Sequence, residues 1–202
     1  MLDCNNINLK SAFMDDAAGT ILTDSLRESE KNLNAAYQRF HQNQSSSDND
    51  FFEIKLQCCI FQFDLCREMV SVYQQQHAGF AGSASLKGLV HKLFEYESLV
   101  KNHLRGRILE LAARRNIQVD REALAELDAH SRPALRALRK WNSVRNKAAG
   151  HYDSDLRLQV ELIESLRYDQ VFDTACAFVQ YNMGLLIILR DASQGLVRAP
   201  LP

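Results

Sequence analysis

The sequence contains little of the material from which turns and β-sheets are built. Of its 202 residues only 8 are Gly and 3 are Pro, and one of the prolines is the last residue. No segment alternates polar and apolar residues with the period of two that indicates a half-buried strand. Scarce turn residues combined with apolar residues at helical spacing predict an all-α fold. We expect an antiparallel bundle of four to five long helices, because most connections are short.

Signals for export, membrane insertion and disulfide formation are also missing. The N-terminus, MLDCNNINLKSAF, shows no basic stretch followed by an apolar run, so we expect no signal peptide. The apolar run MGLLIIL at 183–189 is too short to span a bilayer. The 5 cysteines form no C-x-x-C pair, and we expect buried free thiols at Cys58, Cys59, Cys66 and Cys176. These observations favour a reducing, cytoplasmic location without a membrane partner.

Motifs for metals and cofactors are missing as well. The 6 histidines show neither H-x-x-x-H nor H-E-x-x-H spacing. The acidic residues near the C-terminus lack the E-x-x-H element of di-iron bundles. The sequence has no Gly-rich phosphate loop and no G-x-S-x-G element. We therefore expect neither a metal ion nor a cofactor.

One helical domain is expected to occupy most of the chain. Residues 1–18 are predicted to be a loosely ordered N-terminal segment, 19–195 the single helical domain, and 196–202 a C-terminal tail. Within the domain, the segments at 51–76 and 171–191 are apolar around most of their circumference. That pattern is typical of helices at the centre of a bundle or buried in a dimer.

Two internal boundaries are predicted in the second half of the chain. Asp120 is expected to cap a short helix, and Pro133 to fit the first turn of a separate helix that follows. A final long helix is expected over 156–192, with a kink near Arg167.

Acidic residues are missing from one stretch, between Asp128 and Asp153. The basic residues in that stretch are Arg132, Arg136, Arg139, Lys140, Arg145 and Lys147. Such a block can attract phosphate or an acidic partner, and a solvated helix face is the other interpretation. The residues expected to contact nucleic acid are Arg136, Arg139, Lys140 and Lys147.

Arg145 differs from these basic neighbours in its predicted position. On a helix starting at Pro133, it falls on the apolar stripe of Leu138, Trp141 and Ala148, whereas the others point toward solvent. A guanidinium on an apolar face needs a carboxylate, a phosphate or a partner chain, because burying it unpaired is very costly.

His151 follows Arg145 at an offset that would place the two side chains about 120° apart on a regular helix. Gly150 can end the helix in the left-handed conformation and bring His151 round, or a dimer axis can complete the pair. An Arg that holds phosphate and a His that moves a proton form a metal-free phosphodiester site. The structural alternative pairs Arg145 with an interior acid such as Asp173 or Glu164.

The segment RNKAAGHYD, with Arg145, Asn146 and His151, resembles the Arg-Asn…His signature of the HEPN superfamily of all-helical bundles. The apolar C-terminal helix that follows it matches the order found there. The resemblance implies a homodimeric, metal-independent endoribonuclease of toxin or defence type, with a cognate antitoxin or operon partner. Arg145 would then stabilise the scissile phosphate, Asn146 would orient the groups, and His151 would transfer a proton. The substrate 2′-hydroxyl would attack its own phosphate and leave a 2′,3′-cyclic phosphate.

Three flanking residues are expected to support this site: Gly150, Tyr152 and Asp153. For Asp153, capping the next helix is one interpretation and orienting His151 is another.

Two other functions are compatible with the sequence. The first is a non-catalytic, HEPN-like helical module that binds a protein or nucleic acid, in which Arg145 belongs to a structural ion pair. That hypothesis predicts that Arg145→Ala destabilises folding by a few kcal/mol. The second is a small-molecule-binding bundle, which rests on the apolar helices that a core explains equally well.

Overall fold

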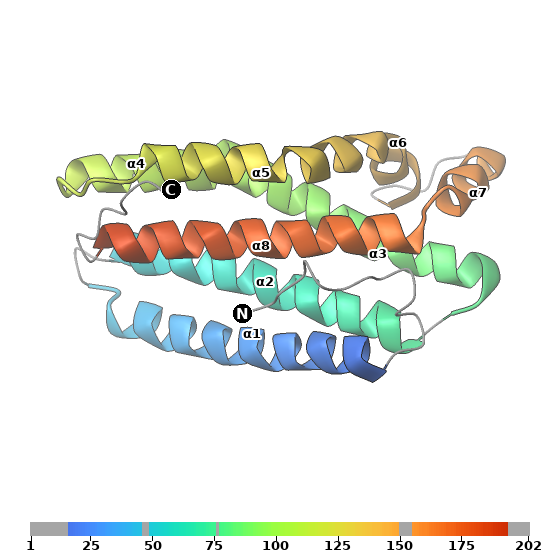
Figure 1. Ribbon diagram of the computed structural model, residues 1–202, viewed down its shortest axis with the longest axis horizontal. Helices are drawn as coiled ribbons and strands as arrows, with labels where there is room; N and C mark the ends of the chain where they lie inside the picture. The colour runs from blue at the N-terminus through green and yellow to red at the C-terminus, as the bar shows by residue number, and fades with distance from the viewer. Residues whose placement is uncertain (1–15, 46–48, 76, 150–154, 194–202) are drawn as a thin grey trace.

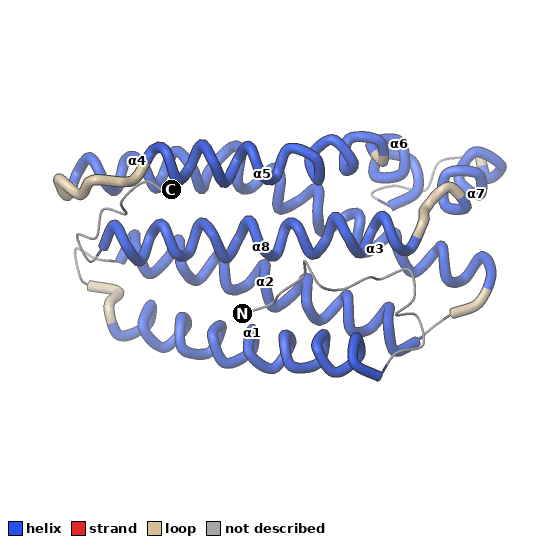
Figure 2. Tube along the Cα trace, viewed as in Figure 1, coloured by secondary structure: helices blue, strands red, loops and turns tan. Residues whose placement is uncertain are grey.

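The computed structural model describes residues 16–45, 49–75, 77–149 and 155–193. These residues are almost entirely helical and contain no strand, which confirms the predicted all-α class (Figures 1 and 2). The α-helices are α1 (Asp16–Gln42), α2 (Asn49–Gln75), α3 (Gly79–Leu99), α4 (Arg105–Arg114), α5 (Arg121–Lys140), α6 (Asn142–Val144), α7 (Leu156–Glu164) and α8 (Tyr168–Ser193). Two π-helical segments, η3 (Val100–Leu104) and η4 (Arg145–Ala149), complete the described chain.

The predicted count of four to five helices is wrong. Apart from the three-residue α6, the described residues form seven α-helices. A π-helix contains i→i+5 hydrogen bonds in place of i→i+4, so η3 divides one apolar pattern into α3 and α4. The N–H of Arg105 accordingly donates to the carbonyl of Val100. The final pattern is also divided, between α7 and α8, close to the predicted kink at Arg167.

The predicted boundary at Pro133 is wrong, because α5 continues through this residue. Pro133 removes one backbone donor, yet its fixed φ is compatible with a helix. Helix α5 packs against α8 on both sides of the proline. Leu127 lies beside Gly184 of α8, and Leu135 lines the same cavity as Ala177 of α8. The predicted cap at Asp120 is confirmed: its Oδ1 accepts from the N–H of Ala123 at 2.9 Å.

The bundle core lies among α2, α3, α5 and α8, while α1 packs on the outer side of α2 (Figure 1). The prediction that two helices are central is confirmed, since Ile54 and Leu65 of α2 and Val171 and Leu185 of α8 are fully buried. By length and composition alone, residues 168–192 of α8 could cross a bilayer: an 18-residue window within them has mean hydropathy 1.4, and half of that window is buried in the bundle. A helix at the centre of a bundle has a similar composition, because neighbouring helices bury its side chains.

A buried polar network ties α2, α3 and α8 together. The Tyr96 hydroxyl donates to Oδ1 of Asn182, which is fully buried. The Nδ2 of Asn182 donates to the Cys58 carbonyl and to Oε1 of Gln62, both at 3.1 Å. Every polar atom of the amide is therefore used, so its burial leaves no group unsatisfied.

The four cysteines of the described residues form no disulfide. Cys58, Cys59 and Cys66 are buried as expected, while Cys176 is half-buried. Burial, followed by the proximity of Cys59, raises the pKa of Cys58 from 9.0 to about 12. A thiol in this environment stays protonated and unreactive at neutral pH.

The ends of the predicted domain organisation lie largely outside the described residues. Of the predicted N-terminal segment, residues 16–18 belong to α1, and the predicted tail at 196–202 is outside the described chain.

Candidate functional site

The Arg145–Asn146 pair lies on η4, which is anchored to the bundle by a row of apolar side chains. The buried residues of this row are Leu138, Trp141, Val144 and Ala148. The N–H of Trp141 donates to the Leu138 carbonyl at 2.9 Å, and the N–H of Arg145 to the Trp141 carbonyl at 3.0 Å. The predicted apolar stripe is confirmed, and it packs η4 against α3.

Arg145 lies at the edge of this stripe rather than within it. Its side chain is 42% exposed, because Val144 takes the buried position. Nη2 lies 3.6 Å from Oε1 of Glu95, whose side chain is 58% exposed. The guanidinium carbon is 5.6 Å from the centroid of the Phe94 ring, within range of a cation–π interaction.

Among the described residues, the carboxylate that Arg145 meets is therefore that of Glu95. The acids considered from the sequence, Asp173 and Glu164, are both exposed and do not provide this contact. A solvent-exposed ion pair contributes roughly 0–1 kcal/mol, so the Glu95 contact holds Arg145 only loosely.

The other basic side chains of this region face solvent, as predicted. Arg136, Arg139 and Lys140 are exposed on α5, and Asn146 and Lys147 are exposed on η4. Offsets of three and four residues place the three α5 cations along one side of that helix.

The remaining predicted site residues lie outside the described residues: Gly150, His151, Tyr152 and Asp153. The convergence of His151 with Arg145 stays a prediction. The helices that border this segment, η4 and α7, pack against each other. Asp155, which begins the described chain again, caps α7 by accepting from the N–H of Leu158 at 3.0 Å.

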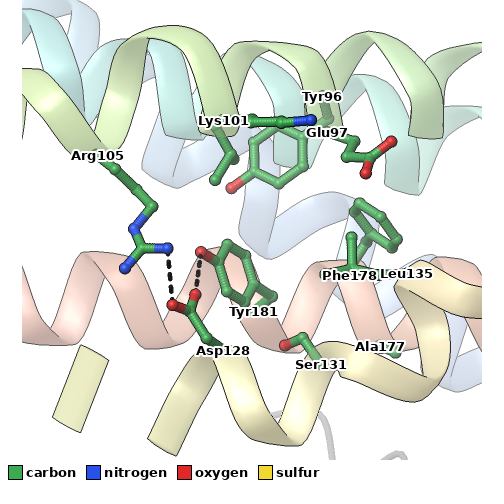
Figure 3. A pocket seen from close by; sticks show the side chains of 11 residues that line it. Tyr96, Glu97, Lys101, Arg105, Asp128, Ser131, Leu135, Ala177, Phe178 and Tyr181 are labelled. Carbon is green, nitrogen blue, oxygen red and sulfur yellow. Dashed lines mark hydrogen bonds and ion pairs between the residues drawn. The ribbon is translucent and has the colours of Figure 1, made fainter. Parts of the chain in front are cut away.

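A second set of charged residues was missed by sequence reasoning. Glu97, Lys101 and Arg105 from α3, η3 and α4 line a cavity together with Asp128 of α5 and Tyr181 of α8 (Figure 3). Spacings of four residues place the first three on one helix face, which is the only local signal. Their partners are distant in sequence, so only the fold brings them together.

The described part of the chain contains no cluster of side chains that could form a metal-binding site. No group of three or more His, Cys, Asp or Glu side chains lies close enough to hold an ion there.

Comparison with known proteins finds no matching family model, no similar curated protein and no similar solved structure.

Proposed function

We propose that this protein is a HEPN-like, metal-independent endoribonuclease of toxin or defence type, acting in the cytoplasm as a homodimer. The observation that carries the proposal is the sequence Arg145-Asn146…His151, with its Arg-Asn pair accessible to solvent on a well-anchored π-helical turn.

Arg145 is suited to receive a phosphate. A guanidinium has five N–H donors in a planar fork, and among the residues that the structure describes its ion pair is the loose one with Glu95. The Phe94 ring limits where the guanidinium can move, because the cation is attracted to the ring face. An RNA phosphate would replace Glu95 as the acceptor.

His151 would transfer the proton, with Asn146 orienting the reacting groups. The imidazole removes the proton of the ribose 2′-hydroxyl, whose oxygen then attacks the adjacent phosphorus. The bond from phosphorus to the 5′-oxygen breaks, and that oxygen leaves with a proton supplied by an imidazolium. The products carry a 2′,3′-cyclic phosphate and a 5′-hydroxyl. An unperturbed pKa of about 6.5 suits imidazole to both transfers.

The exposed cations of α5 and η4 would bind the RNA backbone beyond the scissile phosphate. Arg136, Arg139, Lys140 and Lys147 have no sequence-reading geometry of their own, and phosphate contacts position a substrate rather than specify it. Binding should therefore weaken steeply as salt rises. A cognate antitoxin or operon partner with an acidic surface would inhibit by covering the same cations.

The test is RNA cleavage by the purified full chain in a chelator, using several unrelated RNAs. We expect cleavage with cyclic phosphate ends, and a loss of roughly 10²-fold or more in His151→Ala. His130→Ala is the matched control, because His130 is exposed on α5 outside the motif. An inert wild-type protein, or a His151→Ala variant that cleaves equally well, would overturn the proposal.

The Arg145–Glu95 pair is also the observation that favours the second candidate, a non-catalytic HEPN-like module that binds a partner. In that role Arg145 would stabilise the fold. The two candidates differ in whether replacing Arg145 changes RNA cleavage or unfolding.

A further inference from the structure

A cavity of about 110 Å³ enters the bundle between α3–η3, α5 and α8 (Figure 3). Its inner wall is apolar and aromatic, formed by Tyr96, Leu135, Ala177 and Phe178. Tyr96 and Phe178 belong to the core, being 2% and 5% exposed. A dry cavity of about 150 Å³ can hold a benzene ring, so this one fits a somewhat smaller apolar group such as a branched aliphatic chain.

One side of the cavity is a fixed polar wall. Nη1 of Arg105 lies 2.7 Å from Oδ2 of Asp128, and the Tyr181 hydroxyl donates to Oδ1 of Asp128 at 3.1 Å. Burial and the Asp128 charge raise the pKa of Tyr181, so the phenol keeps the proton that it donates. Both oxygens of Asp128 are thus engaged, and its charge is balanced by Arg105.

Glu97 and Lys101 differ from this pair because neither has a partner among the described residues. Glu four residues before Lys is the arrangement that forms ion pairs on a regular α-helix. No ion pair joins them in the part of the chain that the structure describes, and both line the cavity. The π-helical segment η3 begins at Val100, between the two residues, and changes the helical register there.

The entrance therefore offers one negative and one positive charge that no ion pair matches within the described ranges. A ligand with only a negative charge would be attracted by Lys101 and repelled by Glu97. A ligand with only a positive charge would be attracted by Glu97 and repelled by Lys101. Lys101 is exposed and Glu97 half-buried, so a ligand at the entrance can reach both. A ligand that carries both charges forms charge-assisted hydrogen bonds with both side chains at once.

We propose that this cavity binds a small α-amino acid with a branched aliphatic side chain. Glu97 would accept hydrogen bonds from the ligand ammonium group, and Lys101 would donate to its carboxylate. The aliphatic chain would enter the apolar part of the cavity, against Phe178 and Leu135. This inference is independent of the proposed RNA cleavage.

Binding is tested by isothermal titration calorimetry of the full chain with L-leucine, L-isoleucine and L-valine. 3-Methylbutylamine and 4-methylpentanoate are the matched probes, because each keeps the branched chain and one of the two charges. We expect at least one amino acid to bind, and each single-charge probe to bind at least about 10-fold more weakly.

Glu97→Gln and Lys101→Gln should each weaken the amino-acid complex by at least about 10-fold. Glu126→Gln is the control, since Glu126 is exposed on α5 and does not line the cavity. Ala177→Leu fills the cavity and should abolish binding; the two glutamine variants test the site even if this one fails to fold. The proposal is overturned if none of the three amino acids binds, if a single-charge probe binds as tightly, or if both glutamine variants retain wild-type affinity.

Discussion

The two π-helical segments, η3 and η4, are the same local deformation in two different settings. η3 continues directly into α-helix on both sides and turns Lys101 toward a cavity enclosed by α5 and α8. η4 follows α5 and α6, and its Asn146 and Lys147 are exposed to solvent. Neighbouring helices thus decide whether such a turn lines a cavity or lies on an open surface.

Helix α3 forms the wall between the two regions. Glu95 faces Arg145 of η4, whereas Glu97 lines the cavity. Two residues correspond to about 200° of helical rotation, so the two carboxylates leave the helix on opposite sides. The chain therefore offers a pair of nearly identical substitutions that separate the two sites.

The largest expected effect comes from removing the buried anchor of each π-helical segment. Leu104 of η3 is fully buried, so Leu104→Ala should lower the free energy of unfolding by about 2–5 kcal/mol. Val144→Ala, beside η4, should cost less because fewer buried groups are removed. Urea denaturation followed by circular dichroism measures both; a loss in Val144→Ala as large as that in Leu104→Ala would contradict this expectation.

Replacing Arg145 separates catalysis from structure at η4. If Arg145 stabilises the scissile phosphate, Arg145→Ala should slow RNA cleavage by roughly 10²–10³-fold. The free energy of unfolding should change by less than about 1 kcal/mol, because the pair with Glu95 is exposed. Arg139→Ala, an exposed cation of α5, is the control and should weaken RNA binding mainly at low salt, without slowing the cleavage step. A loss of several kcal/mol in stability with no catalytic change would favour the non-catalytic module.

Replacing the two glutamates of α3 should have smaller effects, each on a different ligand: one replacement strengthens RNA binding and the other weakens amino-acid binding. Glu95→Gln removes the carboxylate that competes for Arg145, so RNA affinity in a filter-binding assay should rise several-fold, by up to about 10-fold. Glu97→Gln should leave RNA affinity unchanged while weakening the amino-acid complex. If both variants change the same property, the two regions are not separate sites.

The smallest expected effect is a loss of folding stability at alkaline pH, caused by the buried Cys58 thiol of the core. Above pH 9 the Cys58 thiol ionises in the unfolded chain, whereas in the folded chain its pKa is raised to about 12. The unfolded state then binds fewer protons, so stability falls as pH rises. One such thiol accounts for a loss of about 1 kcal/mol between pH 9 and pH 10.

The free energy of unfolding, measured between pH 9 and pH 10, should show that loss. The Cys58→Ala variant should show a smaller decrease of this free energy with pH. Cys176→Ala, at a half-buried thiol, is the control. An unchanged slope in Cys58→Ala would show that other groups, such as Tyr96, whose pKa burial also raises, dominate the effect.

The sequence predicted those features that depend on local periodicity. The all-α class, the buried row from Leu138 to Ala148, the central helices and the cap at Asp120 all follow from spacing and residue type. The uninterrupted α5 was not predicted, because the packing of its face on α8 outweighs the boundary signal of Pro133.

The contacts of the candidate sites were less accessible to sequence analysis. Glu95, the partner of Arg145, precedes it by fifty residues, and Asp128 and Tyr181 come to the cavity from separate helices. No residue pattern in the sequence marks the two π-helical turns that place these side chains. They arise where tertiary packing shifts the register of a helix.

The Asn182 amide at the centre of the bundle has a consequence for any rearrangement of α8. Sliding this helix by one turn, or withdrawing it into lipid, would strand the amide away from Tyr96, Gln62 and the Cys58 carbonyl. An amide without acceptors and donors in a nonpolar medium costs several kcal/mol. One side chain thus fixes the position of α8, a long and largely apolar helix, relative to α2 and α3.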